Sequence, residues 1–174
     1  FIVRYGIDRA QALRVSVLAA AFFRRALPAP DPALAKLVEW AGRLHEIGMS
    51  ISHASFHKHG AYILQHADMP GFSAGEHGRL AVLVLGCRGG LAKIASAIGD
   101  KQVLAALLAL RLAVLVHHAR SAITVPRIRL EIARGIRFGI SQRWLAAHPL
   151  TDYLLAKERA QWAALGHPWR VVAP

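Results

Sequence analysis

The sequence has a single cysteine, Cys87, among its 174 residues. One thiol cannot form a disulfide within the chain, so the sequence is not that of a disulfide-stabilised scaffold. A chain without disulfides is typical of a reducing compartment, and we therefore predict a cytoplasmic location. Cys87 itself is expected to be a small, buried, apolar side chain.

Long uninterrupted apolar runs are also missing. The most apolar stretch, from Val103 to Val116, contains Arg111 and is shorter than the roughly 20 residues that a membrane-spanning helix needs. We therefore predict no membrane span and interpret this stretch as a central buried helix. The chain starts at Phe1 and shows no signal-peptide pattern, so residue 1 is expected to be an internal position of a longer protein.

Acidic side chains are few. Ten Asp and Glu residues stand against 22 Lys and Arg, which gives a formal net charge of +12. This excess attracts anionic partners and makes association with them fast and sensitive to salt. Nucleic acid, phosphorylated metabolites, inorganic polyphosphate and anionic membrane surfaces are the candidate classes. The hydrophobic content of 55% is enough to bury one sizeable core, which excludes a disordered tail.

The first two thirds of the chain has apolar residues at helical spacing. Asp8, Asp31, Ser73 and Asp100 precede such segments as N-caps do, and Glu76 completes a capping box after Ser73. These patterns predict about six helices. Their approximate bounds are residues 9–27, 32–48, 53–67, 74–85, 91–98 and 101–120.

The periodicity changes after Pro126. Residues 128–132 and 136–140 each alternate between apolar and polar side chains, and Arg134-Gly135 lies between them. Two alternating segments joined by a short Gly-containing turn predict a β-hairpin. The arginines of this region are interpreted as a solvated face. They are Arg127, Arg129, Arg134, Arg137 and Arg143.

A hairpin needs cover on its apolar face. A helix over about residues 149–165 can supply that cover, and residues 169–172 are a candidate third strand. The predicted fold class is therefore mainly α. We expect a helical domain over residues 1–122 and a small α+β subdomain over residues 123–174.

Four short segments occur in an order and spacing that extend over nearly the whole chain. They are RLHEIG at residues 43–48, HKHGAYIL at 57–64, ADMPGFS at 67–73 and WLAAHPLT at 144–151. Together they resemble the family of exopolyphosphatases and guanosine pentaphosphate phosphatases. The resemblance implies an N-terminal catalytic half of actin-like form, which binds phosphate chains and magnesium, and a helical half related to the HD phosphohydrolases. This chain resembles the helical half alone.

HD enzymes hold a divalent metal with a His, a His-Asp pair and a distant Asp, which together activate water. By the resemblance, Gln11 stands at the first His position, His45-Glu46 replaces the His-Asp pair and Val114 falls at the last Asp position. The amide of Gln11 is a poor metal ligand, and the isopropyl group of Val114 cannot bind a metal. We therefore predict a degenerate HD site without metal, in which His45 and Glu46 form a hydrogen-bonded pair.

Phosphoanhydride hydrolysis needs Gly-rich turns around the phosphates and a carboxylate that orients water. The Gly-rich loop at residues 86–90 is interpreted as a turn between helices. We predict that the isolated chain has no catalytic residue, no exopolyphosphatase activity and no cofactor, magnesium being expected for the full-length protein only.

The candidate binding residues are Arg43, His57, Lys58, His59 and Arg88. The three consecutive ones lie near the start of a predicted helix, where backbone N–H groups and the helix dipole favour an anion. The leading hypothesis is a non-catalytic domain of an exopolyphosphatase that binds inorganic polyphosphate. It would work with the N-terminal catalytic half of the same protein and form a homodimer.

Other hypotheses stay open at this point. A stand-alone metal-dependent HD phosphohydrolase would bind metal, and the whole protein could prefer guanosine pentaphosphate. His53 and His57, at i and i+4, could share a metal, but no Cys or carboxylate close by completes the set, and a solvated helix start is favoured. A nucleic-acid-binding module is disfavoured, because the chain lacks an RNP pattern, zinc-finger spacing and a basic recognition helix.

Overall fold

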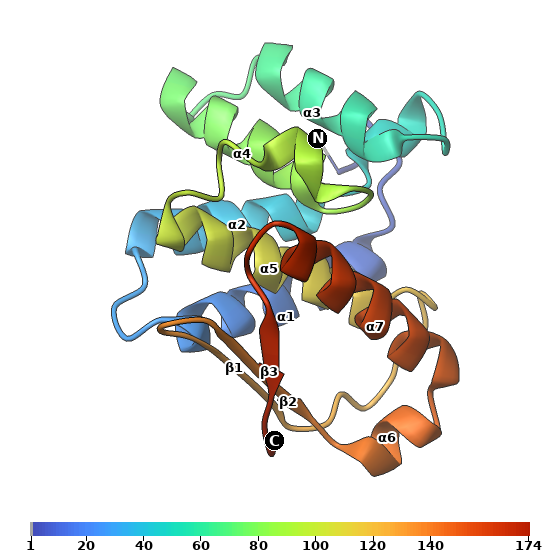
Figure 1. Ribbon diagram of the computed structural model, residues 1–174. Coiled ribbons are helices and arrows are strands. Elements are labelled where there is room, and N and C mark those ends of the chain that lie inside the picture. Colours follow the sequence, from blue (N-terminus) through green and yellow to red (C-terminus); the bar gives the residue numbers. More distant parts are fainter. Residues whose placement is uncertain (1) are drawn as a thin grey trace.

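The computed structural model describes residues 2–174 (Figure 1). Within these residues, five α-helices and two short 3-10 helices precede the sheet. They are α1 (Arg9–Ala26), α2 (Pro32–Leu44), η1 (Ile47–Ser50), α3 (Phe56–His66), α4 (Ala74–Gly86), η2 (Leu91–Ile94) and α5 (Lys101–Val116). Three strands and two further helices complete the described chain, so the predicted class, mainly α with a small β-containing appendage, is confirmed.

Side-chain caps begin four of the described helices at the predicted residues. Asp8, Asp31 and Asp100 each accept a hydrogen bond from the backbone N–H two residues further on. Ser73 and Glu76 form a complete capping box at the start of α4. Each cap satisfies backbone N–H groups that have no acceptor inside the helix.

Helix α5 is the centre of the fold. Helices α1, α2 and α4 pack against it, and α7 (Pro149–Ala164) packs against it from another side. Every residue from Leu104 to Ala113 is buried, Arg111 included, which confirms the predicted buried helix. Over residues 2–174, no helix is both long and apolar enough to cross a membrane.

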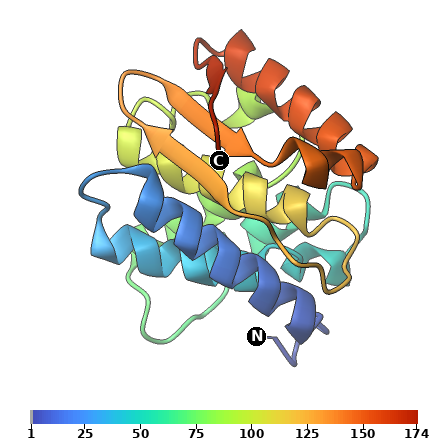
Figure 2. The same ribbon diagram turned by 90° about the horizontal axis from the view of Figure 1, so that it is seen from below.

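The sheet has the strand order β1-β2-β3, from β1 (Ile128–Ile132), β2 (Ile136–Ile140) and β3 (Trp169–Val171). Strands β1 and β2 form the predicted antiparallel hairpin, and β3 joins β2 in parallel. The apolar residues of the two hairpin strands face each other in register and are buried. Figure 2 shows the sheet lying across α5, with α1 on one side and α7 on the other.

Helix α7 matches the helix predicted over residues 149–165. Its buried side chains, Thr151, Leu155, Glu158 and Trp162, recur every three or four residues and form one face. A short preceding helix, α6 (Gln142–Ala146), was not predicted. Five residues are too few to produce a recognisable helical periodicity.

Two predicted helix boundaries near the candidate site were wrong. Helix α2 ends at Leu44 rather than near residue 48, because the chain turns into η1. There Gly48 packs so closely on α3 that a Cβ atom would overlap the carbonyl oxygen of Phe56. Helix α3 begins at Phe56 rather than residue 53, because Ser55 adopts a left-handed φ of 55°.

Two later boundaries also differ. Helix α5 stops at Val116, four residues before the predicted end at Arg120, whose φ of 57° does not belong to a right-handed helix. The helix predicted over residues 91–98 is the 3-10 helix η2 and a series of turns. The boundary predicted at residue 122 lies in the irregular segment between α5 and β1. The division into two domains stays a prediction.

Candidate functional site

The imidazole of His57 is the centre of the candidate site. His57 lies in the first turn of α3, and the residue is only 9% exposed. Its Nδ1 atom is fully buried and has no hydrogen-bond partner within residues 2–174. Buried polar atoms are normally hydrogen-bonded, so this nitrogen is an exception that needs an explanation. The predicted solvated helix start was therefore wrong for His57, whereas His53 is exposed and precedes α3.

Four cationic side chains from different elements act on His57. Lys58 is its neighbour on α3, Arg88 follows α4, Lys93 belongs to η2 and Arg111 to α5. Burial and then these charges lower the pKa of His57 to about 4. Burial likewise lowers the pKa of Lys93 to about 8. The cluster of these five residues, which we call the His57 cluster, therefore carries a concentrated positive charge.

The carboxylate of Glu158, which contacts Arg111 of the His57 cluster, is already paired with that arginine. Glu158 of α7 accepts hydrogen bonds from Arg111 (Nη2 to Oε2, 2.7 Å) and from the indole of Trp162 (2.7 Å). Both charged residues of this ion pair are buried. Arg111 also donates to the carbonyl oxygens of Gly86 (2.7 Å) and Gly89 (3.0 Å). The ion pair thus fixes the loop after α4 against α5 and α7.

The loop at residues 86–90 is a turn between helices, as predicted. Its carbonyl oxygens, rather than its N–H groups, point toward the cations: Arg111 bonds those of Gly86 and Gly89, and Lys93 bonds that of Arg88 at 2.5 Å. In a phosphate-binding loop the backbone N–H groups, and not the carbonyl oxygens, point toward the binding site. Any anion here would therefore be held by side chains of the cluster.

The structure brings together only some of the predicted binding residues. The charges of Lys58 and Arg88 both act on His57, and the Arg88 guanidinium is 5.7 Å from the centre of the neighbouring Phe56 ring. Arg43 instead lies over the ring of Trp40, and neither it nor His59 is among the main charges acting on His57. Lys93 was missed, because its place in the cluster depends on how the Gly-rich loop turns.

The residues at the degenerate HD positions make contacts of another kind. The amide of Gln11 donates to the carbonyl oxygen of His117 (2.9 Å) and accepts from Arg14 (3.0 Å). Val114 is half-buried on α5. His45 is buried, which lowers its pKa, and its Nδ1 lies 2.7 Å from the carbonyl oxygen of Gly42. The Gln11 amide and the His45 Nδ1 atom therefore make hydrogen bonds within the protein.

The predicted hydrogen bond between His45 and Glu46 is not formed. The His45 Nε2 atom is 3.8 Å from the Glu46 carboxylate, which is too long for a hydrogen bond. Glu46 is instead paired with the guanidinium of Arg120, which also contacts Asp8 at 3.2 Å. A cation of the chain itself thus neutralises Glu46.

This arrangement does not fit a divalent metal. Of the four positions, Val114 offers no ligand atom, Gln11 has its amide bonded within the fold, and Glu46 faces Arg120. In the described part of the chain, no group of three or more His, Cys, Asp or Glu side chains is placed to hold a metal ion. The contacts of Glu46 thus argue against a metal-dependent HD phosphohydrolase.

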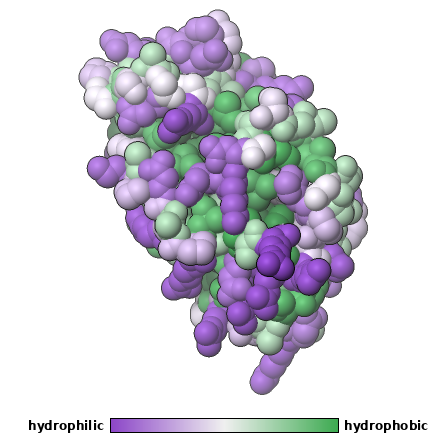
Figure 3. All heavy atoms as spheres, turned by 60° about the vertical axis from the view of Figure 1, so that its left-hand side comes forward, coloured by the Kyte–Doolittle hydropathy of each residue, from purple (hydrophilic) through white to green (hydrophobic). Residues whose placement is uncertain are grey.

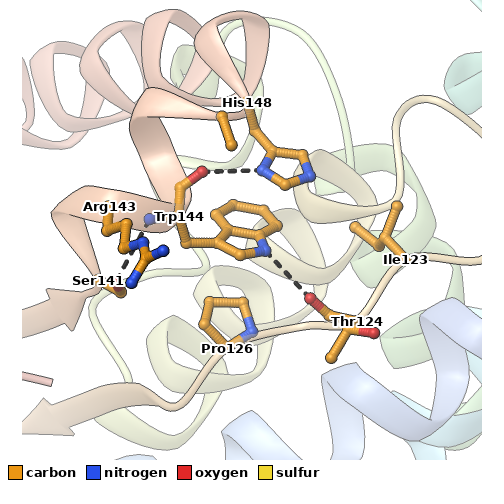
Figure 4. Close-up of a pocket in the computed structure, with 8 residues that line it drawn as sticks. Ile123, Thr124, Pro126, Ser141, Arg143, Trp144 and His148 are labelled. Carbon is orange, nitrogen blue, oxygen red and sulfur yellow. Dashed lines mark hydrogen bonds between the residues drawn. The ribbon is translucent and has the colours of Figure 1, made fainter.

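A depression of about 550 Å³ lies beside α6 (Figure 4). The indole of Trp144 stacks on His148 with ring centres 3.9 Å apart, and Pro126 and Thr124 face it. The indole donates to the carbonyl oxygen of Thr124 (3.0 Å), and His148 Nδ1 lies 2.8 Å from that of Trp144. These contacts hold α6 against the segment before β1, so we assign the stack a structural role.

Sequence comparisons identify the family of the chain. The family described as Ppx/GppA phosphatase, domain III, matches residues 1–159. The guanosine-5'-triphosphate,3'-diphosphate pyrophosphatase of Pseudoalteromonas translucida is 33% identical over 99% of this chain. Proteins of the same name from Vibrio cholerae and Vibrio vulnificus are 32% and 30% identical, each over 95% of it. The chain spans about a third of the length of these relatives, 36%, 34% and 34% respectively.

The fold defines a mainly helical domain that carries a small three-stranded sheet. More particularly, the chain belongs to the Ppx/GppA phosphatase family and corresponds to domain III of its members.

Proposed function

We propose that this chain is a phosphate-chain-binding domain of an exopolyphosphatase and has no hydrolytic site of its own. The observation that carries the proposal is the His57 cluster, in which the charges of Lys58, Arg88 and Lys93 act on a buried imidazole while Glu158 is already paired. Inorganic polyphosphate carries about one charge per phosphate, and binding it to such cations releases counterions. The preferred ligand is therefore inorganic polyphosphate.

Part of the positive charge on the hairpin is compensated by an acidic neighbour. On the hairpin, Arg129 and Arg137 lie 2.8 Å and 3.5 Å from Glu131. On the face drawn in Figure 3, hydrophilic side chains are interspersed with hydrophobic ones. The net charge of +12 thus supplies a general attraction, whereas the His57 cluster supplies a localised one.

A second candidate ligand is guanosine pentaphosphate. The curated relatives are named guanosine-5'-triphosphate,3'-diphosphate pyrophosphatases, and this naming favours a parent enzyme that acts on that nucleotide. A nucleotide with five phosphates engages fewer cations than a long polymer, so its binding would depend less steeply on salt.

The domain would act together with the rest of a longer cytoplasmic protein, and we propose a homodimer as its working form. Leu13 and Val17, one turn apart on α1, are 54% and 61% exposed. Exposed apolar side chains of this kind are available for burial against another protein surface.

Charge reversal tests the proposed binding surface. The double substitution K58E/R88E is expected to weaken polyphosphate binding at least about tenfold at low salt. It should also reduce the slope of log affinity against log salt by about 1 to 2. Fluorescence anisotropy with labelled polyphosphate at two salt concentrations measures both quantities.

The matched control is R134E/R143E, which changes the net charge equally at exposed positions of the hairpin region. It is expected to have a much smaller effect. If both double variants bind equally weakly, or K58E/R88E binds as the wild type does, only a generally basic surface remains and the proposed function fails.

A further inference from the structure

The depression beside α6 has mostly apolar walls and opens to the surface (Figure 4). Ile123 and Pro126 come from the segment before β1, and Ala147 is the residue that follows α6. The indole of Trp144 also lines it, and its stack on His148 and its hydrogen bond to the segment before β1 hold the indole in place. A volume of about 550 Å³ is large enough to accept a bulky side chain or a small molecule.

Two arginines without an ion-pair partner lie in or next to this lining. Arg143 is one of the lining residues, Arg127 directly follows another, and both are exposed. Over residues 2–174 neither forms an ion pair, whereas Arg129 and Arg137 both lie within 3.5 Å of a glutamate. No acidic side chain lines the depression. A complementary ligand therefore carries negative charge next to an apolar group.

The segment that forms one wall has free backbone groups. Residues 122–127 belong to no helix or strand, and in the described chain residues 121–127 form no hydrogen bond with another backbone group. The carbonyl oxygen of Thr124 is engaged by the indole of Trp144. Free N–H and C=O groups at a surface can pair with those of an extended peptide. The wall thus suits a peptide segment better than a compact ligand.

We propose that this depression binds an acidic segment of a partner protein, which one aromatic side chain anchors. The aromatic ring is buried among Ile123, Pro126 and Ala147, and a neighbouring carboxylate of the segment pairs with Arg143. Burial of the ring supplies most of the affinity, whereas the charges orient the segment and speed its association. Polyphosphate has no apolar group, so this surface selects a different ligand from that of the His57 cluster.

The probe is the synthetic peptide acetyl-EDFDE-amide, titrated into the isotope-labelled chain and followed by nuclear magnetic resonance. The indole N–H resonance of Trp144 is expected to shift. Replacing the phenylalanine of the peptide with alanine should weaken binding at least about tenfold, because the anchor is lost. R143E should weaken binding at least about fivefold at low salt, because like charges then repel.

Filling the depression tests the site from the side of the protein. A147F adds a ring at its wall and should weaken binding of the peptide at least about tenfold. A146F is the matched control, because Ala146 is also exposed on α6 but does not line the depression. R134E is the control for R143E, because Arg134 is exposed in the hairpin turn and outside the lining. Both controls should bind as the wild type does.

Equal affinity for this peptide and for the basic peptide acetyl-KRFRK-amide would overturn the proposal, as would equal affinity of A147F and A146F. Resonance shifts confined to the residues around His57 would also overturn it, because the peptide would then bind there through charge alone. The alanine-substituted peptide needs no protein variant, so its result does not depend on how a variant folds. A147F should leave polyphosphate binding unchanged, which tests this inference separately from the proposed function.

Discussion

Replacing Glu158 with Ala is expected to lower the free energy of unfolding by about 3 to 5 kcal/mol. The substitution leaves the Arg111 guanidinium in the core without its carboxylate and removes the acceptor of the Trp162 indole. An uncompensated buried charge is among the most destabilising changes that a single substitution can produce. Urea unfolding followed by circular dichroism measures the loss.

The control for this prediction is the double variant R111M/E158L. It replaces the buried ion pair with apolar side chains of similar length, so no unpaired charge remains, and most of the lost stability should return. Part of the loss will persist, because Arg111 also bonds the carbonyl oxygens of Gly86 and Gly89. A loss below about 1 kcal/mol for E158A, the range of a surface ion pair, would show that the two residues are not a buried pair.

Substituting Gly48 with Ala is expected to cost about 3 kcal/mol. The added methyl group would overlap the carbonyl oxygen of Phe56 and the amide nitrogen of Gly60, and neither backbone atom can move without shifting α3. The melting temperature and the unfolding free energy of G48A measure the effect. Because α3 carries His57 and Lys58, polyphosphate binding by the folded fraction should weaken as well.

Gly75 provides the comparison for G48A. It lies exposed in the first turn of α4, and nothing within 4 Å would meet a Cβ atom there. G75A should be neutral or more stable by up to about 1 kcal/mol, because Ala restricts the unfolded chain. If G48A were as stable as G75A, the close packing of η1 on α3 would be wrong.

Local patterns in the sequence predict much of this fold. The caps at Asp8, Asp31, Ser73 and Asp100 depend on residues two or three positions away, and the hairpin register follows from a strict alternation. The end of α2 depends on Gly48 meeting α3, which is a contact between elements. No local pattern reports such a contact, so the boundary was predicted wrongly.

The candidate site was predictable only in part, for the same reason. Lys58 stands in a segment that carries the family resemblance, Arg88 stands in the Gly-rich loop, and the charges of both act on His57. The partner of Arg111 is 47 residues away, and that of Glu46 is 74 residues away. Charge pairs at such separations depend on helix packing, and a sequence shows only that both charges exist.

Among the residues predicted for a degenerate HD site, Glu46 is paired with a cation of the protein itself. Arg120 provides the positive charge that Glu46 and Asp8 need, and it comes from the residues that follow α5. Its left-handed backbone conformation is one that non-glycine residues rarely adopt. The pairing of Arg120 with two carboxylates therefore offsets a local conformational cost.

The central claim is that the domain recognises phosphate chains at the His57 cluster rather than any polyanion. Competition between polyphosphate and a short DNA of equal charge, at two salt concentrations, tests it most directly. The account predicts tighter binding of polyphosphate at both salt concentrations, with the preference lost in K58E/R88E. Equal affinity of the wild-type domain for the two polymers would contradict it.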